Sequence, residues 1–385
     1  MGWYGMTVVM LCWLLCGCSH DQDEDDNSSE PAVLNIYVYT PDSPIVTRGN
    51  TDFVNPMTGR ATIYSLQLWV FEHENGEQVG YYEPASISDL NLTKSAVYQM
   101  AVSSDFARRK PNVDVYVLAN IKTATCGCEF DETTTRDALD AALLEHAEGG
   151  TDYFGLSARI MAVPETGLPV TGVLKDQKVT GQNPVLRVGD GALATVQLAR
   201  AVSKVRFLFS QLENADEVLQ INRITLNGEA IPKQEYLMLE GPYSGTECHL
   251  GPGGYESGAV VMASDVGVVA SNDDPLNYAF NIQGAQEYEN LINSGLQKSP
   301  AELTEVGPFY LRESDRKLTG TIYYQVNADG AERSANFSMA DDGDFTRNHT
   351  WIVYAYYGSS TLEVFVVRMN AWTVDETVNH EVYNW

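Results

Sequence analysis

The stretch Val113-Asp114-Val115-Tyr116-Val117 indicates the fold class, because every second residue in it is a valine. Side chains alternate between the two faces of a β-strand, so the three valines share one face. Similar runs recur along the chain, which contains 21 tyrosines and many valines, residues that favour pleated sheets. The strands that these runs predict span residues 34–39, 66–71, 113–117, 205–209, 221–226, 320–326, 351–357 and 362–367.

Turn signals separate these strands, and helix signals are scarce. Glycine follows Asn or Asp at four places, and such pairs accept the positive φ that tight hairpin turns require. One helix is predicted over residues 135–147, ended by Gly149-Gly150. Strands that follow one another with so little helix predict antiparallel β-sandwiches rather than β–α–β units. The four turn pairs are Asn75-Gly76, Asn227-Gly228, Asp329-Gly330 and Asp342-Gly343.

Length and composition predict two domains. The chain has 385 residues, enough for two units that each bury a core. Residues 163–191 are rich in Pro and Gly, which predicts loops with short strands, and we place the domain boundary near their end. We therefore expect an N-terminal β-sandwich domain over residues 33–190. A C-terminal β-sandwich domain, with a terminal strand, is expected over residues 191–385.

Residues 1–18 are typical of a lipoprotein signal. Residues 1–17 carry no charge, and the apolar run at 6–15 is shorter than the roughly 20 residues of a membrane-spanning helix. A small residue precedes Cys18, as a lipoprotein signal peptidase requires, so Cys18 is the predicted lipidation site. No Lys or Arg precedes the apolar run, which leaves an upstream start or an atypical signal open. The alternative is a buried helix with ordinary cysteines.

Residues 19–32 are predicted to form an acidic tether. A dense run of Asp and Glu without apolar residues cannot collapse onto itself. The tether either holds the fold away from the membrane or, like the acidic segment of some surface lipoproteins, serves as an export signal. The net charge of −28 argues against nucleic acid as a partner, and anionic lipid headgroups would repel the body of the protein.

The sequence lacks the motifs of the common catalytic sites. No GxGxxG, Walker A, HExxH or GxSxG pattern occurs. The stretch Asp341-Asp342-Gly343-Asp344 lacks the Glu that completes a calcium loop, so it predicts a hairpin turn. His349 opens a predicted strand, which favours a structural role. We therefore expect no enzyme, no cofactor and no metal.

Three cysteines follow Cys18: Cys126, Cys128 and Cys248. Their odd number rules out a complete disulfide framework, so at least one thiol is free or pairs between chains. A zinc site that combines them with His249 is conceivable, but the C-x-C spacing is one residue shorter than zinc sites usually have. The oxidation state of the three cysteines stays open.

Three segments, in this order, resemble the fimbrillins, the subunits of type V pili in some Gram-negative bacteria. Residues 113–120 are similar to the family's strand that ends in Ala-Asn, and residues 198–205 to its segment with Arg, a small residue and Lys. Residues 347–351 are similar to its Arg-Asn-x-x-aromatic motif, and Trp372 and the lipoprotein signal also fit. The resemblance implies an all-β fold of two transthyretin-like antiparallel β-sandwich domains, with one short helix in the first.

The resemblance also implies assembly by strand exchange after export. An Arg-specific protease removes the N-terminal strand, and a strand of a neighbouring subunit fills the groove by β-augmentation. Here the strand removed is residues 34–39, and the candidate processing site is Arg48, with Arg60 as the competing position. The alternative to processing is that Arg48 lies in a surface loop that is not cut, and the alternative to a C-terminal donor strand is an ordinary last strand. The candidate donor is the C-terminal stretch, with Leu362, Val364 and Val366 as its alternating apolar residues.

These observations predict a structural fimbrial subunit that supports surface adhesion. Its partners would be other fimbrial subunits, the outer membrane through the lipid on Cys18, and a ligand on a host or bacterial surface. The location would be the fimbrium and the surface of the outer membrane. The alternative is a non-polymerising or pilus-anchoring lipoprotein that binds glycan or protein, and a lipid-anchored hydrolase is a third hypothesis. Stalk, tip and anchor roles are not separable by sequence.

Overall fold

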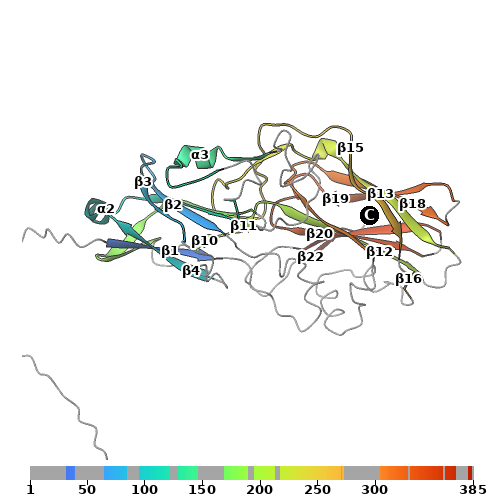
Figure 1. Cartoon of the computed structure of the whole chain (residues 1–385), viewed down its shortest axis with the longest axis horizontal. Helices are drawn as coiled ribbons and strands as arrows, with labels where there is room; N and C mark the ends of the chain where they lie inside the picture. The colour runs from blue at the N-terminus through green and yellow to red at the C-terminus, as the bar shows by residue number, and fades with distance from the viewer. Residues whose placement is uncertain are drawn as a thin grey trace, which may run out of the picture. The chain divides into compact units, whose positions relative to one another are not determined.

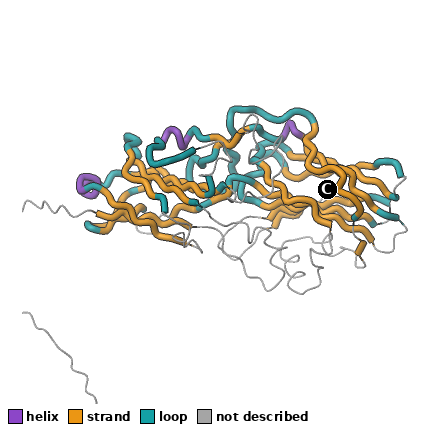
Figure 2. The backbone as a smooth tube through the Cα atoms, in the orientation of Figure 1, coloured by secondary structure: helices purple, strands orange, loops and turns teal. Residues whose placement is uncertain are grey.

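A computed structural model describes residues 32–39, 65–84, 95–121, 129–145, 169–189, 195–212, 217–269, 271–272, 304–327, 330–358, 360–369 and 380–383. Most of these residues lie in strands, as Figure 2 shows, so the predicted all-β sandwich fold is confirmed. Figure 1 gives the element labels. The helical elements are α2 (Ser104–Arg109), α3 (Arg136–Asp140) and the 3-10 turn η3 (Gly228–Ala230).

Two sheets enclose the first core. In one sheet, β1 is paired with β4 on one side and with β9 and β10 on the other, and β8 lies beyond β9. The second sheet has the order β11-β7-β5-β2-β3. The strands of the first sheet are β1 (Ala32–Tyr39), β4 (Ser95–Val102), β8 (Val179–Gln182), β9 (Val185–Val188) and β10 (Thr195–Gln197). Those of the second are β2 (Leu66–Glu72), β3 (Gln78–Tyr82), β5 (Val113–Ala119), β7 (Val170–Gln177) and β11 (Ala199–Arg200).

Two further sheets enclose the second core. One has the order β16-β12-β20-β21-β22, with β17 also paired to β12, and the other the order β15-β13-β18-β19. The strands of the former are β12 (Ser203–Leu212), β16 (Ser271–Asn272), β17 (Thr304–Leu311), β20 (Thr350–Tyr357), β21 (Leu362–Met369) and β22 (His380–Tyr383). Those of the latter are β13 (Leu219–Asn227), β15 (Ala259–Val268), β18 (Leu318–Val326) and β19 (Arg333–Ala340).

The sheet that holds β2 and β5 is buried on both faces. On β2, Leu68 and Val70 face the first core, whereas Trp69 and Phe71 belong to a third apolar cluster. That cluster also contains Leu237, which follows residues 234–236, and Tyr310, which lies in β17. A two-stranded sheet of β6 (Leu143–Glu145) and β14 (Gln234–Tyr236) joins the same regions. The third cluster thus links residues that precede and follow the predicted domain boundary.

Two of the segments that resemble fimbrillins meet in this structure. The Oδ1 atom of Asn348 accepts hydrogen bonds from the backbone N–H of Arg200, at 3.2 Å, and from its Nη1, at 3.4 Å. Asn348 has a φ of +65°, and Asn120, which ends the first segment, has a φ of +64°. Asn tolerates this left-handed conformation better than most residues. The Asn residues of two segments therefore occupy backbone positions that suit their residue type.

The structure differs from the sequence predictions in four places. The predicted helix over 135–147 is wrong in length: it stops after α3, because Leu143–Glu145 pairs with β14. Helix α2 was not predicted. The chain after Asn227 forms η3 rather than a hairpin turn. The sheets are not purely antiparallel, since β1 runs parallel to β9 and β10, and β12 parallel to β16 and β20.

Other local predictions are confirmed. Gly76, between β2 and β3, has a φ of +68°, and Gly343, in the turn after β19, has a φ of +81°. The predicted last strand forms as β21, although β22 follows it. Within the described ranges, no helix is long and apolar enough to cross a membrane.

Candidate functional site

Strand β1 is held on both of its edges. Against β4 it pairs antiparallel along its whole length, from Ala32 opposite Val102 to Tyr39 opposite Ser95. Its other edge pairs parallel, with β9 at residues 33–35 and with β10 at residues 37–39. The backbone N–H of Val33 also donates to the carbonyl of Pro184 at 2.8 Å. An interior strand of this kind cannot leave without exposing unpaired backbone on three neighbouring strands.

The side chains of β1 complete the first core. Leu34, Ile36 and Val38 are at most 1% exposed, while the residues between them are half-buried. Burial of a large aliphatic side chain contributes roughly 1.5–3 kcal/mol each. Without β1, the space between the two sheets would be an apolar slot open to water. We call this space, bounded by β4, β9, β10 and the facing sheet, the β1 slot.

Several predicted site residues lie outside the described residues. Cys18, Arg48 and Arg60 are among them, and so are Cys126 and Cys128. Arg48 and Arg60 belong to the segment 40–64 that connects β1 with β2 in the chain. Proteolytic processing and lipidation therefore stay predictions.

The three predicted donor residues lie in β21. This strand pairs with β20 along eight residues and with β22 along four. Leu362 and Val366 are members of the second core, and Val364 packs against it. By contrast, β22 is the end strand of its sheet and pairs with β21 alone among the described strands. Moving β22 would therefore break pairing with fewer described strands than moving β21.

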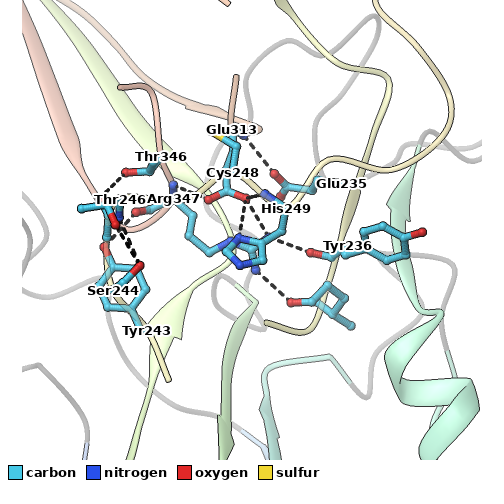
Figure 3. Close-up of polar contacts among 12 residues, drawn as sticks. Glu235, Tyr236, Tyr243, Ser244, Thr246, Cys248, His249, Glu313, Thr346 and Arg347 are labelled. Carbon is cyan, nitrogen blue, oxygen red and sulfur yellow. Dashed lines mark hydrogen bonds and ion pairs between the residues drawn. The ribbon is translucent and has the colours of Figure 1, made fainter. Parts of the chain in front are cut away.

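A buried polar cluster lies near the third apolar cluster (Figure 3). At its centre, Arg347 Nη2 lies 3.0 Å from Glu313 Oε2, and both side chains are at most 1% exposed. The backbone N–H of Arg347 donates to the other oxygen of Glu313 at 2.8 Å. The guanidinium also donates to the carbonyls of Tyr236 and Leu237, at 2.6 and 2.9 Å. One arginine thus joins the chain after β17, the start of β20 and the end of β14.

A second carboxylate, Glu235, lies beside this ion pair (Figure 3). Its Oε2 accepts from the backbone N–H of Glu313 at 2.9 Å, and the side chain is fully buried. Burial raises the pKa of Glu235, and the negative charge of Glu313 adds to this effect. Burial alone would also raise the pKa of Glu313, but the charge of Arg347 and hydrogen bonds from His249 and Arg347 lower it. The pKa values of the two carboxyl groups therefore shift in opposite directions, that of Glu235 upward and that of Glu313 downward.

The predicted zinc candidates Cys248 and His249 belong to this cluster. The Cys248 thiol lies 3.3 Å from the carbonyl of Ser314, and burial raises its pKa to about 12. A thiol that stays protonated is a poor metal ligand. The backbone N–H of His249 donates to Glu313 at 2.9 Å. Within the described ranges, no group of three or more His, Cys, Asp and Glu side chains is arranged to hold a metal ion.

Sequence reasoning did not identify Glu235 or Glu313. Both are ordinary glutamates among 52 acidic residues, and no local pattern distinguishes them. Arg347 stood out only through the segment that resembles fimbrillins. His349, predicted to be structural, is 6% exposed, and its Nδ1 lies 2.9 Å from the hydroxyl of Thr346. The hydrogen bonds of the cluster are suited to hold distant segments of the chain together.

Comparison with known proteins gives matches in structure alone. No family model matches the chain, and no curated protein matches its sequence. A candidate cell adhesion protein from Parabacteroides distasonis is similar, with a TM-score of 0.50 and 15% identity over 91% of this chain and 96% of the other. The tip fimbrial protein Mfa3 from Porphyromonas gingivalis gives a TM-score of 0.47 and 13% identity, over 92% of this chain and 100% of that one.

A fimbrial assembly protein from Parabacteroides distasonis gives a TM-score of 0.46 and 12% identity, over 92% and 100% of the two chains. At these identities, the likeness concerns the fold. The first match shows that the chain shares the fold of a candidate cell adhesion protein.

Proposed function

We propose that this protein is a structural subunit of a surface fimbria, exported as a lipoprotein and assembled by donor-strand exchange. The observation that carries the proposal is β1. It is the first described strand of the chain, it is paired on both edges, and Leu34, Ile36 and Val38 fill the first core. A cut in the segment between β1 and β2 would separate this strand from the rest of the fold in a single step.

A vacated β1 slot would require a replacement strand. Its edges offer unpaired backbone groups, and its floor is apolar, so water cannot fill it favourably. An incoming strand that runs in the direction of β1 and places an apolar residue at every second position would restore the backbone hydrogen bonds and the apolar packing. Main-chain hydrogen bonds would supply the affinity, and the alternating side chains would fix the register.

The proposed donor is the C-terminal stretch that begins at Leu362. Its final part, residues 370–385, is the better candidate for exchange, since β21 contributes to the second core. Apolar residues recur at even positions in this part, at Trp372, Val374, Val378 and Val382. Such spacing presents them on one face of an extended strand. A second copy of this chain, or another fimbrial subunit, would accept it.

The proposed route to the surface begins with lipidation of Cys18. The lipid would hold the precursor at the outer membrane, since the acidic body has no attraction for anionic headgroups. Cleavage after Arg48 would then release the subunit from its lipid and open the β1 slot together. A copy that is not cleaved would keep its lipid and its β1 strand, and it would serve as an anchor or as a free surface lipoprotein.

The proposal is tested by the polymers that cells form with altered processing sites. Surface material from cells with the wild type, with Arg48→Ala or with Arg60→Ala is heated gently and run on a gel. We expect ladders of regular spacing for the wild type and for Arg60→Ala, and a single precursor band for Arg48→Ala. A single band for all three proteins would favour the non-polymerising lipoprotein, and ladders for all three would remove Arg48 from the account.

A further inference from the structure

The outer face of the sheet β15-β13-β18-β19 contains a hollow of about 590 Å³. This volume lies within the range of about 300–1,000 Å³ that is common for small-molecule sites. The hollow is separate from the β1 slot, since none of its lining residues belongs to the first core. Its polar lining residues are Thr225, Asn227, Lys317, Thr319, Thr321, Tyr323, Asn336 and Ser338.

Strand register places short polar side chains across this face in rows. Thr321 on β18 lies opposite Thr225 on β13 and opposite Asn336 on β19. The next row on β18 and β19 pairs Thr319 with Ser338. Along β18, the residues between these positions are buried, so Thr319, Thr321 and Tyr323 share the outer face. The hollow thus combines hydroxyl and amide groups with apolar surface, including the rings of Tyr323 and Phe337.

The hollow carries little net charge in a very acidic protein. No carboxylate is among its described lining residues, although the chain has a net charge of −28. The one lining cation, Lys317, lies 3.2 Å from Asp341 Oδ1. Beside the hollow, the guanidinium of Arg223 lies over the ring of Tyr323 and 3.4 Å from Glu332 Oε2. Both cations are thus balanced by carboxylates, which favours an uncharged ligand.

One hydroxyl in the hollow has no hydrogen-bond partner among the residues that the structure describes. Ser338 is 7% exposed, and its Oγ makes no hydrogen bond to the described residues. An unsatisfied buried hydroxyl costs free energy, and a ligand that bonds to it recovers that cost. Thr321, in contrast, already donates to Asn336 Oδ1 at 2.9 Å. Ser338 is therefore the lining residue whose hydrogen bonding the described residues leave unsatisfied.

We propose that this hollow binds a short neutral oligosaccharide. Sugar hydroxyls both donate and accept hydrogen bonds, as do the Ser, Thr and Asn side chains in the lining. The rings of Phe337 and of Tyr323, which Arg223 covers on one face, add apolar surface next to them. An anionic ligand finds no unbalanced cation here, and a cationic ligand finds no carboxylate in the lining. The inference is independent of strand exchange, because it uses no residue of β1 or its neighbours.

The test measures binding of neutral hexasaccharides to the purified protein by isothermal titration calorimetry. The probes are maltohexaose, cellohexaose and mannohexaose, with a hyaluronan hexasaccharide as the anionic comparison. Thr321→Trp fills the hollow and is expected to abolish binding. Asn336→Ala and Ser338→Ala remove single polar groups and are expected to weaken binding about 3- to 10-fold. Ser334→Ala changes an exposed residue of β19 outside the hollow and is the matched control.

Ser338→Ala separates binding from structure, because loss of an unsatisfied buried hydroxyl should not lower the temperature of thermal unfolding. Binding of at least one neutral hexasaccharide, lost in Thr321→Trp and retained in Ser334→Ala, would support the proposal. Three results would overturn it: no binding of any neutral probe, binding of the hyaluronan probe alone, or binding that Asn336→Ala and Ser338→Ala leave unchanged. If Thr321→Trp does not fold, the hexasaccharide affinities of Asn336→Ala and Ser338→Ala test the proposal.

Discussion

Arg347 and Glu313 form an ion pair that water does not reach, with Nη2 and Oε2 3.0 Å apart and both side chains at most 1% exposed. Removing two charges from water is costly, and this cost is recovered only when the remaining donors and acceptors are paired. Here the guanidinium also binds two backbone carbonyls, and the carboxylate also accepts two backbone N–H groups. The pair therefore connects the chain beside β17 and β20 with the end of β14, which belongs to another sheet.

Arg347→Ala should destabilise the protein strongly. It would leave the carboxylate of Glu313 buried without its counter-charge, and such changes typically cost about 3–5 kcal/mol. Chemical denaturation followed by tryptophan fluorescence measures the free energy of unfolding. Arg108→Ala is the control, since the Arg108–Asp105 pair is at the surface, and we expect no measurable change there. Equal effects of the two variants would contradict the structural role of Arg347.

Glu235→Gln should flatten the dependence of stability on pH. Burial raises the pKa of Glu235 to about 8, whereas an unfolded Glu titrates near its usual value of 4.5. Between these values the folded state holds a proton that the unfolded state has released, so the free energy of unfolding falls as pH rises. Gln mimics the protonated form and can still accept from the backbone N–H of Glu313.

At pH 8 we expect Glu235→Gln to be more stable than the wild type by up to about 4 kcal/mol, with little difference near pH 4.5. Urea denaturation at a series of pH values measures this. Glu77→Gln, at the surface, is the matched control and should leave the profile unchanged. A wild-type profile that rises between pH 5 and pH 8 because of Glu235 would contradict the assigned protonation.

Ile36→Asp should disrupt the precursor, while Asn35→Asp should be tolerated. Ile36 is 1% exposed in the first core, so a carboxylate there is buried without a partner, and we expect a loss of more than about 3 kcal/mol. Asn35 is half-buried, and its Oδ1 accepts from Gln99 at 3.3 Å, a bond that Asp retains. Thermal unfolding of the precursor measures both. Similar melting temperatures would mean that β1 does not occupy its slot.

Truncation should separate stability from assembly at the C-terminus. A chain that ends at Met369 keeps β21 and the second core, so it should fold yet form no polymer. A chain that ends before Leu362 loses Leu362 and Val366 from that core and should be unstable. Circular dichroism and gel ladders report the two properties. Polymers formed by the chain that ends at Met369 would move the donor strand away from residues 370–385.

The strands were predictable where the alternation of residue types along the sequence is strong. Residues 113–117 and 320–326 lie in strands of the structure, β5 and β18, because their pattern matches the period of a strand. Tertiary pairing determined what the pattern could not. Leu143 and Leu144 fit a helical spacing equally well, and only β14, about 90 residues later in the chain, makes them a strand.

The polar cluster and the hollow could not be predicted, for a similar reason. Glu235, Glu313 and Arg347 are far apart in sequence, and burial alone distinguishes the two glutamates from the many at the surface. Ser338 became a candidate only when the strand register placed it beside Thr319. The proposed removal of β1 comes from the resemblance to fimbrillins, and the structure adds the pairing of β1 on both edges.

The most direct test of strand exchange is the N-terminal sequence and intact mass of the protein recovered from the cell surface. The account predicts a chain that starts at Gly49 and carries no lipid, because processing after Arg48 removes β1 with everything before it. A chain that starts at an acylated Cys18 and still contains β1 would contradict the account. In that case the β1 slot is filled by the protein's own strand, and the protein is an anchor or a free surface lipoprotein.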